Sequence, residues 1–126
     1  MRFDNNRPIY LQIADLIFEY ILSKKWVPED RIPSVREIAE MMEVNPNTAV
    51  RVFGHLSDRG IIYNKRGIGY FVAKDGYQRV LNEKKKEFQS IDLPILFKKM
   101  ILLDIDMEEL KTGFTTFKNE LNHDEN

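Results

Sequence analysis

Polar side chains that can both donate and accept hydrogen bonds gather in one short stretch of the sequence. Asn45, Asn47 and Thr48 carry amide and hydroxyl groups, and Arg51 follows three residues after Thr48. Such groups hydrogen-bond base edges and phosphates. A second group, Lys65-Arg66-Gly67-Ile68-Gly69, joins two cations to two glycines that let a backbone approach a large ligand closely. This pattern favours nucleic-acid binding over bond-breaking chemistry.

The distribution of charge agrees with that interpretation, although the net charge of the 126-residue chain is only −1. Residues 45–76 contain five basic and two acidic side chains, a net charge of +3. Residues 77–126 contain eight basic and ten acidic side chains, a net charge of −2. Because a basic region attracts phosphates, we expect the middle of the chain to face double-stranded DNA.

The groups that catalysis or a cofactor would need are missing from the sequence. The chain has no cysteine, and its two histidines, His55 and His123, are far apart along it, so both are interpreted as surface or packing residues. Gly67-x-Gly69 lacks the third glycine and the following helix of a dinucleotide site, and there is no phosphate-loop lysine motif. We expect no enzymatic activity, no metal site and no cofactor.

The hydropathy pattern argues against a membrane protein. The first residues, Met1–Asn5, are polar and unlike a signal peptide, and the most apolar stretch, Ile91–Ile105, is interrupted by four charged residues. A membrane span needs about 20 mostly apolar residues. With 43% hydrophobic and 31% charged residues and no cysteine, we expect a globular cytoplasmic protein that contacts no membrane.

The polar stretch needs helices to position it, and the flanking sequence predicts three. Apolar residues at three- and four-residue spacing predict a helix from Pro8 to about Lys25. Ser34 and Glu37 form a capping box for a short second helix. After the tight connection Glu43-Val44, Asn45 caps a third helix that Gly60 ends, and its predicted buried positions are Ala49, Val52, Phe53 and Leu56. Two short helices joined by a tight turn form a helix-turn-helix.

A hairpin and a helical tail follow. Two β-like segments, Ile61–Tyr63 and Tyr70–Val72, flank a glycine-containing connection, which is typical of a hairpin. Helical patterns resume after Gly76, with further starts at Pro94 and Asp106. The fold class predicted is mainly α with a small β-hairpin wing: a winged helix-turn-helix domain, residues 1–76, and a short helical dimerisation tail, residues 77–126.

The tail contains more apolar side chains than a small helical segment can hide. Exposed apolar patches mark interfaces, so we expect the tail to pair two copies of the chain. The residues assigned to this homodimer contact are Leu93, Leu96, Phe97, Met100, Ile101, Leu110, Phe114 and Phe117. A small cavity between the two protomers that admits an effector is a further hypothesis, and the effector itself is unknown. The run Lys84-Lys85-Lys86 is interpreted as a solvated helix face.

Three motifs in order carry a family resemblance: Pro33–Ala39, Val44–Ala49 and Gly67–Val72. Together they resemble the signature of the GntR family of bacterial regulators, and the Asn-Pro-Asn-Thr variant at 45–48 resembles its YtrA subfamily. The resemblance covers roughly Pro8 to Val72. It implies a transcription regulator, expected to be a repressor, that binds a pseudo-palindromic operator as a homodimer. It also implies that Arg36, the start of the third helix and the wing tip contact DNA.

The DNA-contacting residues predicted from the residues and the resemblance together are Ser34, Arg36, Asn45, Asn47, Thr48, Arg51, Lys65, Arg66, Gly67 and Gly69. Some alternatives stay open. Arg36 could instead pair with Glu40 on the surface, and Arg51 could contact a phosphate or a base. Gly54 is interpreted as a site of close packing against the first helix. The whole module could also serve a protein partner, in which case apolar anchors would occupy the recognition face.

Overall fold

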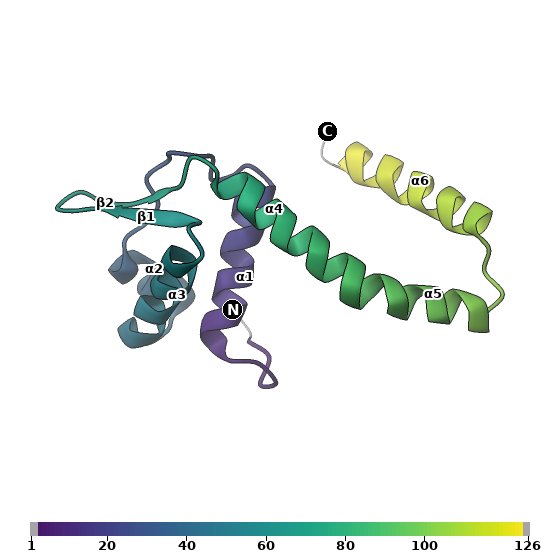
Figure 1. Cartoon of the computed structure of the whole chain (residues 1–126), viewed down its shortest axis with the longest axis horizontal. Coiled ribbons are helices and arrows are strands. Elements are labelled where there is room, and N and C mark those ends of the chain that lie inside the picture. Colours follow the sequence, from purple (N-terminus) through teal and green to yellow (C-terminus); the bar gives the residue numbers. More distant parts are fainter. Residues whose placement is uncertain (1–2, 125–126) are drawn as a thin grey trace. The chain divides into compact units, whose positions relative to one another are not determined.

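In the computed structural model, which describes residues 3–124, six α-helices and one two-stranded antiparallel sheet follow each other along the chain (Figure 1). The first two residues of the polar N-terminal stretch lie outside this range. The chain divides into two compact units, one ending at Lys84 and the other beginning at Lys85. The elements are α1 (Ile9–Leu22), α2 (Val35–Met42), α3 (Pro46–Asp58), β1 (Ile62–Lys65), β2 (Gly69–Val72), α4 (Gly76–Glu87), the π-helical η1 (Phe88–Asp92), α5 (Leu93–Leu102) and α6 (Met107–Asp124).

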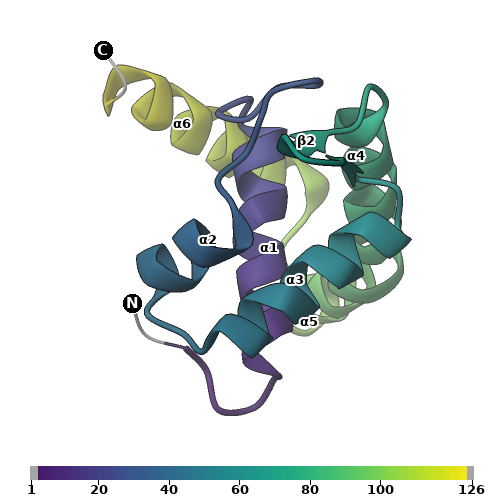
Figure 2. The ribbon, with the colours of Figure 1, turned by 90° about the vertical axis from the view of Figure 1, so that its left-hand side faces the viewer.

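The first unit is built around α3, against which both α1 and α2 pack. Figure 2 shows α3 crossing in front of α1. The three- and four-residue spacing of apolar positions gives each helix one buried stripe. In α3 this stripe is the predicted one, and Phe53 also meets the ring of Tyr70 from β2, with ring centroids 4.7 Å apart. The core side chains are Ile13, Ala14, Ile17, Phe18, Ile21, Ile32, Ile38, Ala39, Met42, Ala49, Val52, Phe53, Leu56, Ile61, Ile62, Val72 and Val80.

The turn between α2 and α3 depends on two local features. Glu43 adopts a left-handed conformation, φ 55°, which ends α2 and reverses the chain. Asn45 then caps α3, and Pro46 occupies the first helical position, where its missing N–H costs nothing. At the other end of α3, Gly60 has φ 71°, as expected for a glycine that stops a helix. The predicted helix-turn-helix is therefore confirmed.

The predicted hairpin is present, but its strands are longer and its loop shorter than expected. β1 and β2 pair in antiparallel register from Ile62↔Val72 to Lys65↔Gly69, so Lys65 lies in a strand and the loop holds only residues 66–68. The loop after α1 joins them: Glu29 N–H donates to Val72 C=O, and Ile32 N–H donates to Tyr70 C=O. This pairing was not predicted, because it links residues some forty positions apart.

The two helices predicted before and after Pro94 are not separated by a loop. The backbone stays helical from α4 through η1 into α5, because a five-residue π-helical segment takes the place of the expected break. Asp104 with φ 56° follows α5, and Asp106 Oδ1 accepts a hydrogen bond from Glu109 N–H at the start of α6. The predicted cap at Asp106 is confirmed.

Candidate nucleic-acid interface

The first turn of α3 presents polar groups to solvent. Asn45 Oδ1 accepts a hydrogen bond from Asn47 N–H at 2.8 Å, which occupies the acceptor oxygen of Asn45 but leaves its amide NH₂ group exposed. The Asn47 side chain is exposed and Thr48 is half-buried. The structure thus brings together at one helix end the three polar residues that the sequence singled out. The N-terminal end of a helix also favours negative charge.

The capping box of α2 is formed as predicted. Ser34 Oγ accepts from Glu37 N–H at 3.1 Å, while Ser34 N–H donates to Glu37 Oε1 at 3.2 Å. Ser34 therefore has a structural role, and its DNA contact remains a prediction. Arg36 is exposed, and within residues 3–124 it forms no ion pair with Glu40. The surface pair considered as an alternative for Arg36 is not formed, so its guanidinium is available to a ligand.

Arg51 is held against α1 rather than extended from α3. Its guanidinium carbon lies 4.2 Å from the centroid of the Tyr10 ring. Such a cation–π contact at an exposed site is worth about 0.5–1 kcal/mol, enough to favour one position of a long side chain. Tyr10 was not singled out from the sequence, since an aromatic residue in an amphipathic helix is ordinarily packing. It is the residue that orients the Arg51 cation.

Gly54 does not permit close packing against the first helix, and the sequence interpretation of this residue is wrong. The residue is exposed, and a Cβ added to it would meet no atom within 4 Å. The buried stripe of α3 lies on the opposite side of the helix, at Ala49, Val52, Phe53 and Leu56. A glycine in a helix interior costs about 1 kcal/mol relative to alanine, and among residues 3–124 no close packing contact at Gly54 offsets that cost.

The wing presents its cations at its tip. Lys65 and Arg66 are exposed, and Gly67 and Gly69 have φ values of 80° and 143°. The second value is rarely accessible to any residue but glycine. A Cβ at Gly69 would also lie 3.1 Å from Arg31 Nε, so the absence of a side chain makes room for that guanidinium.

Arg31 is a cation of the wing that the sequence did not reveal. Its backbone bridges to Phe71, and its guanidinium packs on Gly69. Lys65 Nζ lies 4.7 Å from the centroid of the Phe71 ring on the neighbouring strand. The wing therefore carries three exposed basic residues rather than the two predicted. The only signal for Arg31 was its place in a loop between two prolines, which says nothing about pairing with β2.

The C-terminal half of α3 is linked to α4 by a short polar chain. Arg59 Nε donates to His55 Nε2 at 3.1 Å, and Arg59 Nη1 pairs with Glu83 Oε1 at 2.6 Å. Burial and the Arg59 charge lower the pKa of His55, outweighing the opposite effect of nearby carboxylates. His55 therefore stays neutral near pH 7, which its role as acceptor from Arg59 requires.

Asp15 ties α4 to α1. Asp15 Oδ1 accepts from Lys84 Nζ at 2.9 Å, and Asp15 Oδ2 accepts from Arg7 Nη1 at 2.7 Å. Burial raises the pKa of Asp15, but the two cations together outweigh burial and bring the pKa below its usual value. Lys84, interpreted from the sequence as part of a solvated face, is instead a half-buried partner of Asp15, whereas Lys85 and Lys86 are exposed as expected.

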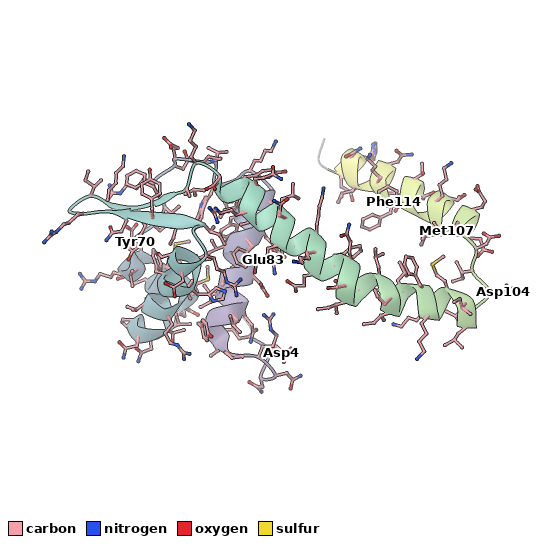
Figure 3. The ribbon with its side chains drawn as sticks, in the orientation of Figure 1. Asp4, Tyr70, Glu83, Asp104, Met107 and Phe114 are labelled. Atoms are coloured by element: carbon pink, nitrogen blue, oxygen red, sulfur yellow. The ribbon has the colours of Figure 1, made fainter. Side chains whose placement is uncertain are left out.

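The residues assigned to dimerisation differ in exposure. In α5, Met100 is buried, Leu93 and Leu96 are half-buried, and Phe97 and Ile101 are 46% and 81% exposed. Helix α6 has no buried residue between Met107 and Asp124. Its Phe114 and Phe117 side chains are 64% and 63% exposed, and Figure 3 shows the ring of Phe114 standing away from its helix. Leu110 is half-buried. Half of the eight assigned residues are therefore exposed to solvent in the single chain.

Among residues 3–124, no helix combines the length and the apolar character that crossing a membrane requires. The arrangement described above, three helices followed by a hairpin with the polar first turn of α3 exposed, defines a winged helix-turn-helix protein.

Comparison with known proteins gives the family. The profile of "Bacterial regulatory proteins, gntR family" matches residues 9–72. The regulator YhcF of Bacillus subtilis is 38% identical over 116 residues, covering 92% of this chain and 94% of YhcF. The repressor YtrA of the same species is 34% identical over 80 residues, covering 64% of this chain and 62% of YtrA. The chain therefore belongs to the GntR family, and the resemblance to YtrA is confirmed.

Solved structures agree with this assignment. A GntR family transcriptional regulator from Listeria monocytogenes superposes with a TM-score of 0.71 at 30% identity, covering 90% of this chain and 98% of that one. The DNA-binding domain of AraR, solved in complex with an operator, superposes with a TM-score of 0.54 at 28% identity. That match covers 57% of this chain and 93% of the AraR domain.

Proposed function

We propose that this chain is a transcriptional repressor that binds a pseudo-palindromic operator as a homodimer. The observation that carries the proposal is the exposed polar first turn of α3, with Asn45 and Asn47 at the surface. Arg36 of α2 is exposed as well and forms no ion pair within residues 3–124. A surface made for a protein partner would instead be expected to place apolar anchors there. YtrA is named a repressor, and the AraR domain was solved on its operator, which supports the same role here.

We divide the proposed DNA contacts into those with base edges and those with the phosphate backbone. Asn47 and Thr48, at the start of α3, are placed to read base edges in the major groove, as recognition helices do. Ser34 and Arg36, at the N-terminal end of α2, and Asn45, the cap of α3, would fix the register of the helix-turn-helix on the DNA backbone. Arg51 is held by Tyr10, so we assign it to a phosphate. The wing contributes Lys65, Arg66, Gly67 and Gly69, whose cations and close backbone suit phosphate or minor-groove contact.

The second unit supports the homodimer. Exposed apolar residues on α5 and α6 would leave water if a second copy covered them. At about 25 cal/mol for each Å² of apolar surface buried, association of these faces would be favourable. Two winged domains held together in this way would meet half-sites about one helical turn apart. The domain division proposed from the sequence, with DNA binding in residues 1–76 and dimerisation in residues 77–126, is retained in this proposal.

The test of the proposal compares the affinity of the protein for two DNA duplexes of equal length. One comes from the promoter region of the protein's own operon, and the other has a random sequence. Fluorescence anisotropy over a series of salt concentrations should give tighter binding to the promoter and a steep loss of affinity with salt. Arg36→Ala should weaken promoter binding, whereas Lys118→Ala, which removes the same charge from α6, should not. Equal weak binding of both duplexes by the wild type, or equal behaviour of the two variants, would contradict the proposal.

A further inference from the structure

The outward face of α3 contains a residue that none of the assigned contacts uses. Val50 is 56% exposed, although it lies in the middle of the helix and one turn after Pro46. Three- and four-residue spacing places it on the same face as Asn47 and Gly54. Single exposed apolar side chains are common on protein surfaces and by themselves call for no explanation. The neighbours of Val50 make this one different.

The face around Val50 is built from poor helix formers. Valine and glycine both have lower helix propensity than alanine, lysine or glutamate, which a solvent-facing position would accept equally well. Gly54 leaves open space one turn after Val50, since a Cβ there would meet no atom within 4 Å. The combination of an apolar side chain and an empty neighbouring position suits an external surface that approaches α3 closely.

Arg51 borders this space together with Tyr10, His55 and Asp58, and its guanidinium is held on the Tyr10 ring. Val50, one turn before Gly54, is the exposed apolar side chain of this part of α3, and the amide of Asn47 lies one turn before it. In a major groove, the apolar group that such a side chain meets is the C5-methyl of thymine, which distinguishes thymine from the other bases.

We propose that Val50 is a specificity-determining residue that contacts a thymine methyl group, and that Gly54 allows the duplex to come close enough for this contact. The proposal rests on the proposed function, because it requires α3 to enter a major groove. It adds a readout by shape and apolar contact to the hydrogen bonds assigned to Asn47 and Thr48.

The test removes one methyl group at a time from the DNA. The intact protein first selects its preferred duplex from a random-sequence library. Each thymine of a half-site is then replaced singly by deoxyuridine, which lacks only the C5-methyl. For the wild type, one replacement should weaken binding about threefold to fourfold, the effect of losing one buried methyl group. For Val50→Ala, the same replacement should change the affinity less than about 1.5-fold.

Met41→Ala is the matched control. Met41 is an apolar residue of α2 that is 54% exposed, close to the value for Val50, and its removal should preserve the wild-type response to deoxyuridine. Circular dichroism and binding to random DNA show that each variant is folded and still attracts phosphates.

The outcomes separate this inference from the proposed function. Three results would overturn the role of Val50 and leave the proposed regulator function standing. They are specific binding that is insensitive to every deoxyuridine, a half-site without thymine, and equal sensitivity in wild type and Val50→Ala. Failure to select any preferred duplex would overturn both.

Discussion

The guanidinium of Arg51 lies over the ring of Tyr10, with 4.2 Å between the guanidinium carbon and the ring centroid. This contact joins α3 to α1 and gives a long, flexible side chain a preferred position. The same ring meets His55 edge-on, with ring centroids 5.9 Å apart. Tyr10 thus contacts two side chains of α3, Arg51 and His55, that follow the polar first turn.

Arg51→Ala should weaken binding to operator and random DNA by the same factor, because a phosphate contact carries no sequence information. The slope of log Kd plotted against log salt concentration should decrease by about one. Tyr10→Leu should weaken both DNAs about twofold to fivefold by releasing Arg51, while Tyr10→Phe, which keeps the ring, should bind as the wild type does. Anisotropy titrations measure all three variants. A loss confined to the operator would show that Arg51 reads a base instead.

Gly54→Ala should stabilise the protein and weaken DNA binding at the same time. Alanine removes the helix penalty of glycine, so the free energy of unfolding should rise by about 1 kcal/mol, as measured by urea denaturation. Operator affinity should fall, because the new methyl group enters the space that the duplex is proposed to approach.

Thr112→Ala on α6 is the control for this substitution. It also raises helix propensity, by up to about 0.7 kcal/mol, but it lies outside the helix-turn-helix and should leave DNA binding unchanged. Wild-type operator affinity in Gly54→Ala would show that α3 does not approach DNA on this face.

His55 should make stability depend on pH in the mildly acidic range. Its pKa in the folded protein is lowered, by burial first and then by Arg59, below the ordinary value of 6.5. The unfolded chain therefore binds more protons than the folded chain between those two pKa values. The stabilisation that neutral His55 gives the folded protein is fully present above pH 6.5 and is lost as the pH falls through the folded pKa.

Thermal melts of wild type and His55→Gln between pH 7.5 and pH 5 measure this effect. Glutamine can still accept a hydrogen bond from Arg59 but does not titrate, so the melting temperature of His55→Gln should fall less on acidification. His123→Gln should keep the wild-type difference, because His123 takes no part in the Arg59 contact. Parallel curves for wild type and His55→Gln would contradict the assignment.

Phe117→Asp should weaken the proposed homodimer. Phe117 is 63% exposed in the single chain, and a second copy that covered it would have to bury the new carboxylate, which is unfavourable without a partner. Sedimentation velocity over a range of protein concentrations should show a larger monomer fraction, and operator affinity should fall with it. Asn119→Asp places the same charge two residues on, toward the other side of α6, and should remain dimeric. A monomeric wild type would exclude the dimer.

Much of the first unit could be predicted from the sequence, because its signals are local. Ser34 and Glu37 form the capping box that their spacing predicts, and Asn45, Pro46 and Gly60 begin and end α3 where expected. Caps, left-handed stops and apolar stripes depend on residues within one or two turns of each other, and so they can be read along the chain. The polar first turn of α3 was found in the same way.

Tertiary structure alone decided the relationships between distant residues. Arg31 joins the wing because the loop after α1 pairs with β2, and Tyr10 holds Arg51 because α1 packs across α3. Gly54, interpreted from the sequence as a packing position, proved to face outward. Composition and spacing establish which side chains share a helix face, but the face that meets a neighbouring element depends on how the helices pack. That packing is set by the summed burial of many apolar groups across the whole unit rather than by any short stretch of sequence.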